Sequence, residues 1–212
     1  PDVVMSAIVL GAGPGLGLSL ARAYAETHRG VAVVTRRPEV AEELAAQVGG
    51  AVDLAADLGD PAAVTAVVRE AADRLGAPDL VHYNASVMFE GSPSSVPLEA
   101  VERSWRVGCL GAWAALQAAV PLMPEGSAFF VTGGGMALDP WPPASALASA
   151  KAALRNLVLA AAKELTDIRV AMITIQGVIG SSPELSPDEI ARYFLALLEQ
   201  TDPPVETLLP VR

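Results

Sequence analysis

The sequence predicts an α/β fold, in which one doubly wound parallel sheet is covered by helices on both faces. Short apolar segments alternate with longer helix-like segments along the whole chain. The apolar segments are continuous rather than alternating with polar residues, which is typical of parallel strands buried on both faces. A length of 212 residues with no internal repeat and no linker predicts a single domain over residues 1–212.

Strands and helices are expected in alternation. The expected strands lie at residues 6–10, 31–35, 51–54, 80–83, 128–132 and 169–175, with an edge strand at 206–209. The expected helices run from a glycine-rich turn to about residue 28, and then over 39–48, 60–75, 98–123, 145–165 and 187–199. Asp60 followed by Pro61 marks one helix start, because Asp caps a helix and proline fits the first helical position. Proline-containing loops at 91–97 and 139–143 follow strand ends, where such sheets bind ligands.

Composition excludes several classes of protein. Hydrophobic residues make up 52% of the chain and charged residues 18%, which excludes a disordered or low-complexity chain. The net charge of −10 disfavours binding of nucleic acid or an anionic membrane through the overall field. The single Cys109 excludes an internal disulfide framework and a cysteine-rich zinc site. His28 and His82 are far apart in the sequence, so no metal site is expected.

No segment has the length and hydrophobicity of a membrane span. The longest apolar run, residues 108–120, is too short and contains Gln117. Residues 1–6 lack the basic region and long apolar core of a signal peptide. A cytoplasmic location is therefore expected.

A glycine-rich turn joins the first strand to the first helix. Gly11, Gly15 and Gly17 fall where the chain must turn tightly, and a side chain there would block approach of a pyrophosphate to the backbone. The helix that follows offers unpaired N–H groups and a positive dipole end to such an anion. This context predicts dinucleotide binding; the alternative is a tight turn with a purely structural role.

Two arginines follow the second strand, at the position that distinguishes NAD from NADP. An acidic residue there accepts a hydrogen bond from a ribose 2′-hydroxyl, whereas arginine pairs with a 2′-phosphate. Residues 34–36 include no acid, and Arg36 and Arg37 supply two guanidiniums. NADP is therefore predicted over NAD; the alternative is a solvated basic pair at a helix start.

Motifs along nearly the whole chain resemble the short-chain dehydrogenase/reductase family. They are the glycine turn Leu10–Gly17, Asp57-Leu58, Tyr83-Asn84-Ala85-Ser86, Phe130–Gly134, Leu147–Lys151 and Gln176–Ser181. The resemblance implies an NAD(P)-binding Rossmann fold with Asp57-Leu58 beside adenine. The cofactor contacts implied by the turn, the arginines and the resemblance are Gly11, Gly13, Pro14, Gly15, Leu16, Gly17, Arg36, Arg37, Asp57, Leu58, Asn84, Ala85, Lys151, Gly177, Ile179 and Ser181.

The catalytic positions depart from the family pattern. In the family, a tyrosine donates a proton to the substrate carbonyl, a lysine lowers the pKa of that tyrosine and holds the nicotinamide ribose, a serine orients the substrate, and an asparagine relays protons. Here the tyrosine position is Leu147, the serine position Gly134 and the asparagine position Gly108. Lys151 is retained; a lysine whose amine reaches solvent is the structural alternative.

Two other hydroxyls are candidate proton donors. Tyr83 ends the fourth strand, and Thr132 shares strand parity with Gly134. Structural roles, in which these hydroxyls satisfy backbone groups, are the alternative. The catalytic candidates are therefore Lys151, Thr132 and Tyr83, and the expected substrate pocket consists of Gly134, Met136, Trp141 and Leu147.

Three functions are compatible with these residues. The first is an NADP-dependent oxidoreductase with an atypical site, acting on a carbonyl, an alcohol or an activated double bond. The second is a non-catalytic NADP-binding sensor or partner subunit, and the third is a scaffold that binds no dinucleotide.

The helices at 98–123 and 145–165 resemble the pair through which the family dimerises, so a homodimer or homotetramer is expected. Trp105 and Trp113 share a helix face that is expected to lie in the core or at a subunit interface.

Overall fold

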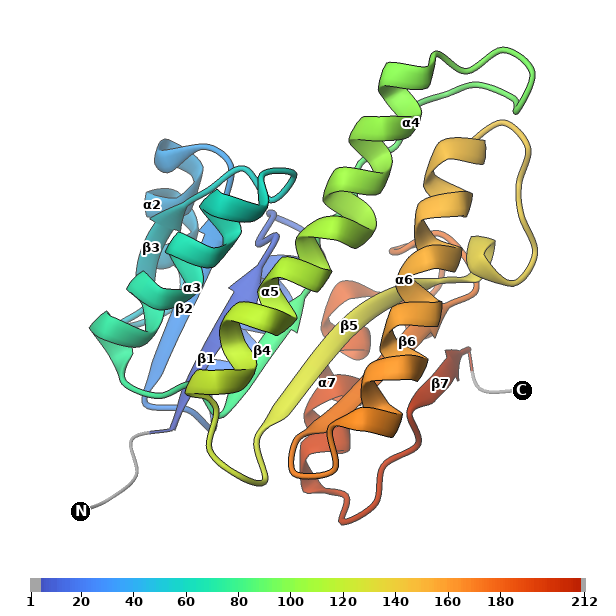
Figure 1. Ribbon diagram of the computed structural model, residues 1–212. Coiled ribbons are helices and arrows are strands. Elements are labelled where there is room, and N and C mark those ends of the chain that lie inside the picture. The colour runs from blue at the N-terminus through green and yellow to red at the C-terminus, as the bar shows by residue number, and fades with distance from the viewer. Residues whose placement is uncertain (1–4, 211–212) are drawn as a thin grey trace.

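The computed structural model describes residues 5–210 and contains one parallel sheet of seven strands (Figure 1). The strands are β1 (Ser6–Leu10), β2 (Gly30–Thr35), β3 (Val52–Ala55), β4 (Leu80–Tyr83), β5 (Ala128–Gly134), β6 (Arg169–Ile175) and β7 (Glu206–Leu209). Their order across the sheet is β3-β2-β1-β4-β5-β6-β7. The predicted doubly wound α/β fold is confirmed. The chain reverses its direction of winding between β1 and β4, which is where folds of this kind place ligands.

In the described part of the chain, seven α-helices cover the two faces of the sheet. They are α1 (Leu16–Ala25), α2 (Pro38–Ala46), α3 (Pro61–Leu75), α4 (Leu98–Trp105), α5 (Gly111–Ala119), α6 (Ser145–Glu164) and α7 (Pro187–Glu199). Buried side chains of α3, α5 and α6 form one core layer against the sheet, and those of α1, α2 and α7 form the other. Figure 1 shows α3, α5 and α6 in front of the sheet and α7 behind it.

Strand parity explains why the strands read as continuous apolar runs. In β1, Ile8 and Leu10 enter the layer with α3, α5 and α6, whereas Ala7 and Val9 enter the layer with α1, α2 and α7. Both faces of the sheet are therefore shielded from water, and neither tolerates a polar side chain without a hydrogen-bond partner. Asp60 caps α3 as predicted, since its carboxylate accepts a hydrogen bond from the Ala62 N–H at 3.0 Å.

The long helix expected over residues 98–123 is not one regular α-helix. A π-helical segment η1 (Arg106–Leu110) separates α4 from α5, and a 3₁₀ turn (Val120–Leu122) follows α5. Glycines let this region pack closely: a Cβ at Gly108 would lie 3.0 Å from the Ala150 Cβ of α6, and one at Gly111 would collide with the Leu58 carbonyl. Such wide turns are common beside functional sites.

Trp105 and Trp113 do not lie in the core, which excludes one of the two places expected for them. Their exposed fractions are 46% and 48%, and the Trp105 indole N–H donates to Ser149 Oγ on α6 at 2.9 Å. Cys109 is a buried free thiol whose pKa is raised by burial.

Residues 5–210 contain neither a membrane-spanning helix nor a cluster of metal-binding side chains. No helix in that range is long and apolar enough to cross a bilayer, and no group of three His, Cys, Asp or Glu side chains is placed to hold a metal ion. Most of the stretch at residues 1–6, weighed above against a signal peptide, lies outside the described residues.

Candidate functional site

A cavity of about 340 Å³ opens at the carboxyl ends of β1 to β4, beside the point where the winding reverses. It is lined by Gly11, Ala12, Gly13, Thr35, Arg36, Arg37, Ala56, Asp57, Leu58, Asn84, Ala85, Ser86, Val87, Arg103 and Val107. The structure thus gathers the glycine turn, both arginines, Asp57-Leu58 and Asn84-Ala85 around one space. A volume of this size suits part of a nucleotide.

Two glycines of the turn are required by packing. Gly11 has φ +90°, and a Cβ there would lie 2.6 Å from the Ala85 backbone nitrogen. A Cβ at Gly17 would lie 2.6 Å from Ala12 Cα, so this glycine allows α1 to start against the turn. Packing alone would therefore require glycine at these two positions, even in a turn that binds no ligand.

The other two glycines are not explained by packing. A Cβ at Gly13 or Gly15 would meet no protein atom within 4 Å, and neither residue has a positive φ. The N-terminus of α1 beside them has no acidic residue in its first turn and no side-chain cap. A surface with open space, N–H groups and a positive dipole end fits the pyrophosphate of a dinucleotide.

Charged side chains line the outer part of the cavity. Arg36 and Arg37 border it at the end of β2. The Nε of Arg37 lies 3.9 Å from a Glu39 carboxylate oxygen, a long pairing between two exposed side chains. Asp57 and Arg103 complete the charged lining, and the sequence interpretation missed Arg103.

Asn84 fixes the inner end of the cavity. Its side-chain N–H donates to the Gly11 carbonyl at 3.0 Å, and its Oδ1 accepts from the Thr132 hydroxyl at 2.8 Å. The glycine turn, the end of β4 and β5 are therefore joined through one amide.

A buried histidine extends this chain of hydrogen bonds, and the sequence interpretation missed its role too. His82 Nε2 lies 2.9 Å from the Thr132 hydroxyl oxygen, and Nδ1 lies 2.6 Å from the Tyr24 hydroxyl of α1. Since Thr132 donates to Asn84, the network assigns the proton of the imidazole to Nε2. Burial, and to a smaller degree the charge of Lys151, lowers the pKa of His82 to about 3, so the ring is neutral near pH 7.

Lys151 lies on α6 with its side chain almost fully buried. Its Nζ donates to the Thr132 carbonyl at 2.8 Å. Burial lowers the pKa of Lys151 to about 8. A Cβ on Gly134 would lie 3.6 Å from the Lys151 methylenes, so Gly134 lies beside the stem of this side chain. A titratable amine near neutral pH can both hold a hydroxyl and transfer a proton.

The hydroxyls of Tyr83 and Thr132 are both engaged inside the protein. Tyr83 is fully buried; its O–H donates to the Val107 carbonyl at 2.5 Å, and burial raises its pKa far above the usual value. Its hydroxyl is therefore bound to the backbone and is not a free proton donor, the role that the sequence interpretation had allowed. The Thr132 hydroxyl is held between Asn84 and His82. For both residues, the contacts favour the structural role weighed as the alternative.

Several predicted contact residues do not line the cavity. They are Pro14, Gly15, Leu16, Gly17, Lys151, Gly177, Ile179 and Ser181, together with the expected pocket residues Gly134, Met136, Trp141 and Leu147. They nonetheless lie at the same edge of the sheet. At this edge the loops that contain Gly91 and Ala144 are in contact, and the Gly91 N–H donates to the Pro143 carbonyl at 2.8 Å. Gly177 is close-packed, since a Cβ there would lie 2.6 Å from Leu185 Cδ1. Leu147 is buried and Trp141 is exposed.

Comparisons with known proteins identify one family. Residues 5–183 match the family described as short chain dehydrogenase. Versicolorin reductase stcU of Emericella nidulans is 28% identical over 176 residues, which cover 80% of this chain and 62% of that protein. Versicolorin reductase 1 of Aspergillus parasiticus is 30% identical over 172 residues, covering 77% and 65%. The chain therefore spans less than two thirds of the length of these curated relatives.

Solved structures share the fold over almost the whole chain. An alcohol dehydrogenase from the archaeon Thermococcus sibiricus, complexed with 5-hydroxy-NADP, superposes with a TM-score of 0.89 at 24% identity, covering 97% of this chain and 95% of that one. A metagenomic short-chain oxidoreductase in complex with NADP gives a TM-score of 0.83 at 25% identity, covering 97% and 96%. A short chain dehydrogenase from Burkholderia cenocepacia, also in complex with NADP, gives 0.88 at 22%, covering 96% and 95%.

Proposed function

The chain belongs to the short-chain dehydrogenase/reductase family, and from that premise we propose that it is an NADP-dependent oxidoreductase with an atypical active site. The observation that carries the proposal is the open space at Gly13 and Gly15 beside the start of α1, together with the cavity that Gly13, Arg36 and Arg37 line. Nothing in the packing of the protein requires glycine at positions 13 and 15. A bound pyrophosphate does, because its oxygens must approach the backbone N–H groups.

The described residues fit the parts of this cofactor. The turn around Gly13 and the N-terminus of α1 would hold the pyrophosphate. Arg36 and Arg37 would hold a 2′-phosphate, for which paired guanidiniums are suited. Several structural neighbours contain NADP or NADPH, which supports NADP over NAD. When bound, the nicotinamide would supply or accept a hydride.

Lys151 would be the side chain that acts at the nicotinamide end of the cofactor. It would hold the ribose hydroxyls, as in the family. Gly134, Met136, Leu147 and Trp141, the residues assigned to the substrate pocket, carry no acid or base. Proton transfer to a reduced carbonyl would therefore fall to Lys151 or to water. Reduction of an activated double bond, in which the proton can come from solvent, is the reaction class least affected by Leu147.

A second function, non-catalytic NADP binding as a sensor or partner subunit, is favoured by a specific observation. Three positions that carry polar groups in the family are here Leu147, Gly134 and Gly108, and Gly108 is needed for the close approach to Ala150. An asparagine at Gly108 would need Ala150 on α6 to move away by a few tenths of an ångström. The site would then retain the cofactor without completing the chemistry.

Calorimetric titration of NADPH and NADH into the protein tests the cofactor. We expect tighter binding of NADPH, and its loss in Gly13→Leu, whose side chain would fill the open space. Gly49→Leu is the matched control, because a Cβ there also meets no atom within 4 Å and the residue does not line the cavity. Binding of neither cofactor to the folded wild type would leave the scaffold hypothesis.

Turnover separates the two functions that remain. NADPH oxidation is followed across a panel of carbonyls and enones, with wild type and Lys151→Ala. Oxidation that depends on Lys151 refutes the non-catalytic alternative. Binding of NADPH without oxidation over the whole panel refutes the enzyme.

We also propose that the protein forms a homodimer or homotetramer through α4, α5 and α6. Trp105, Leu110 and Trp113 expose large apolar side chains on this region, and such residues are enriched at subunit interfaces. Light scattering of the wild type and Trp113→Glu tests this: a larger wild-type mass that falls to the monomer mass in the variant is expected, and a monomeric wild type contradicts it.

A further inference from the structure

The cavity that would receive the 2′-phosphate contains a carboxylate. Its lining includes the guanidiniums of Arg36, Arg37 and Arg103 and the carboxylate of Asp57. A phosphate monoester carries a charge of about −1.5 to −2 near pH 7. An unpaired carboxylate in the same cavity would repel it and oppose the two arginines at the end of β2.

Arg103 pairs with this carboxylate through two parallel hydrogen bonds. Arg103 Nη1 lies 3.0 Å from one Asp57 oxygen, and Nη2 lies 2.7 Å from the other. The Gly59 N–H adds a third bond to Asp57 Oδ1 at 2.9 Å. The Arg103 hydrogen bonds are the largest cause that lowers the pKa of Asp57, so this carboxylate is ionised and held in place.

The pair is too exposed to be explained by stability alone. The exposed fraction of the side chain is 30% for Arg103 and 44% for Asp57. Ion pairs at that exposure contribute little to the free energy of folding. Their effect on a charged ligand in the same cavity is larger, because the ligand excludes the water that screens them.

Gly59 makes room for the pair. A Cβ at Gly59 would collide with Nη1 of Arg103, and Gly59 does not adopt a positive φ. Glycine at this position therefore leaves the guanidinium free to take its observed place, whereas a side chain would push the guanidinium aside. Asp57, Gly59 and Arg103 form one unit, although Arg103 comes from α4 and the other two follow β3.

We infer that Arg103 is a specificity-determining residue for NADP over NAD, which acts by neutralising Asp57 so that the cavity presents net positive charge to a 2′-phosphate. The inference rests on the proposed NADP binding and adds a third arginine, far from β2 in sequence, to its recognition. Within the lining, three guanidiniums face one carboxylate, and without Arg103 the excess of positive charge is halved. The effect is local, because the chain as a whole has a net charge of −10.

The test is the ratio of NADPH to NADH affinity, measured by calorimetry on the full chain. In Arg103→Met, which keeps most of the aliphatic stem, we expect the ratio to fall about tenfold, mainly through weaker NADPH binding. In the double variant Asp57→Asn/Arg103→Met, the repelling charge is gone, and the ratio should return to within about threefold of the wild type. Any effect of Asp57 on adenine cancels in the ratio, since both cofactors contain adenine.

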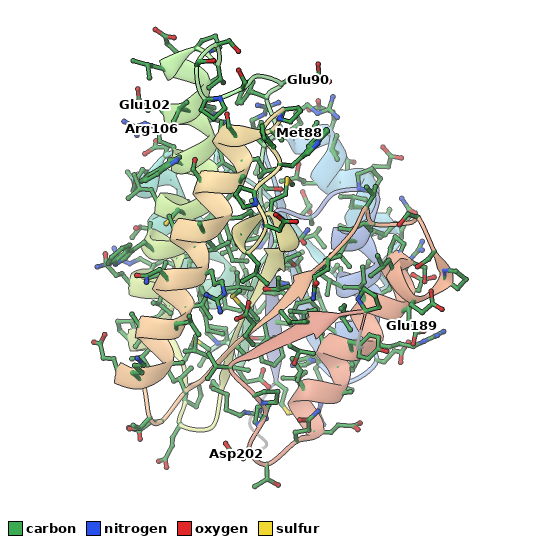
Figure 2. All side chains as sticks on the ribbon, turned by 90° about the vertical axis from the view of Figure 1, so that its right-hand side faces the viewer. Met88, Glu90, Glu102, Arg106, Glu189 and Asp202 are labelled. Carbon is green, nitrogen blue, oxygen red and sulfur yellow. The ribbon has the colours of Figure 1, made fainter. Side chains whose placement is uncertain are left out.

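Arg106→Met is the matched control. Arg106 directly follows α4, and its Nε lies 2.8 Å from a Glu102 carboxylate oxygen; both residues are labelled in Figure 2. Neither residue lines the cavity. Removal of Arg106 takes away the same charge and should change the ratio less than twofold. If Arg103→Met fails to fold by circular dichroism, Gly59→Ala gives a second route, because its Cβ displaces the guanidinium while keeping the arginine. A fall of about threefold in the ratio is then expected.

Each outcome decides the inference. A ratio unchanged in both Arg103→Met and Gly59→Ala overturns it. A ratio that falls in Arg103→Met and is not restored by Asp57→Asn also overturns it, because Arg103 would then contact the phosphate directly. A wild type that binds NADPH no better than NADH overturns the specificity proposal, while binding of neither refutes the proposed function itself.

Discussion

Lys151 Nζ lies 2.8 Å from the Thr132 carbonyl oxygen, so the buried amine in the second turn of α6 is held by a neutral backbone group. Within residues 5–210, no carboxylate forms an ion pair with it. A charged amine in this position loses hydration without gaining a counter-ion. The consequences can be measured in stability as well as in activity.

Lys151 should make stability rise with pH above 8. The unfolded chain keeps this proton up to a pKa of about 10.4, whereas the folded protein releases it near pH 8. Lys151→Met removes this dependence on pH. The free energy of unfolding of the variant, taken relative to that of the wild type at the same pH, should therefore be about 2 kcal/mol lower at pH 9.5 than at pH 7. Urea unfolding at the two pH values measures this. Lys163→Met, near the exposed end of the same helix, is the control, and an equal shift in both variants would contradict the prediction.

His82 should make stability fall with acid. Its pKa is about 3 when folded and about 6.5 when unfolded, so the unfolded chain takes up a proton first as the pH falls below 6.5. The loss should reach about 3 kcal/mol at pH 4.5. When the pH is lowered from 7 to 4.5, the free energy of unfolding of His82→Phe should not show this loss. His28→Phe, which keeps His82, should show it. Thermal or urea unfolding of the three proteins is sufficient.

Tyr83→Phe should affect stability and leave chemistry unchanged. The variant loses the hydrogen bond to the Val107 carbonyl, at a cost of about 1–3 kcal/mol because a buried acceptor is left unsatisfied. If the phenol were instead the proton donor, the rate of NADPH oxidation would fall at least about 100-fold. The two measurements on one variant decide between these roles.

Gly134→Ser/Leu147→Tyr should create or strengthen carbonyl reduction. A Cβ at Gly134 fits at ordinary contact distance from Lys151, so the serine can be accepted. The tyrosine would restore a general acid one helical turn from Lys151, and such a donor contributes about 10²–10⁴-fold. The rate of NADPH oxidation by simple ketones and aldehydes should therefore rise at least about 100-fold. Gly134→Ser alone should give no such gain. No gain in a double variant that folds and binds NADPH would show that other features disable the site.

Local patterns were sufficient for most of the fold. Continuous apolar runs, the cap Asp60 and the glycine turn are all features of neighbouring residues, and the strands and helices they predict lie within a few residues of those observed. The π-helical segment at Arg106–Leu110 was not predictable, because a wide turn leaves no distinct pattern in a helical sequence. The exposure of Trp105 and Trp113 depends on which helix face the neighbours cover.

The site was predictable only where it lies close together in sequence. The glycine turn and Arg36-Arg37 are contiguous motifs, and the structure places them on one cavity. Arg103 was missed because its partner Asp57 is separated from it by a whole helix and strand, and a lone arginine on a helix carries no signal. His82, in contrast, could have been found from the sequence, because a polar residue inside an apolar strand that is buried on both faces needs a hydrogen-bond partner. Its cross-strand neighbour in β5 is Phe130, two residues from Thr132, on the same side of the sheet.

The pairing of β1 with β4, in which Ala7 lies opposite Leu80, has a consequence in time. During synthesis the glycine turn emerges well before its wall at Ala85 and Asn84, which is made only after β4, and Arg103 follows later still. A nascent chain that ends before α4 therefore displays a nucleotide-binding motif without a nucleotide-binding cavity. Cofactor capture can begin only once the chain as far as α4 has left the ribosome, and until then the edge of β1 that will pair with β4 is open to other partners.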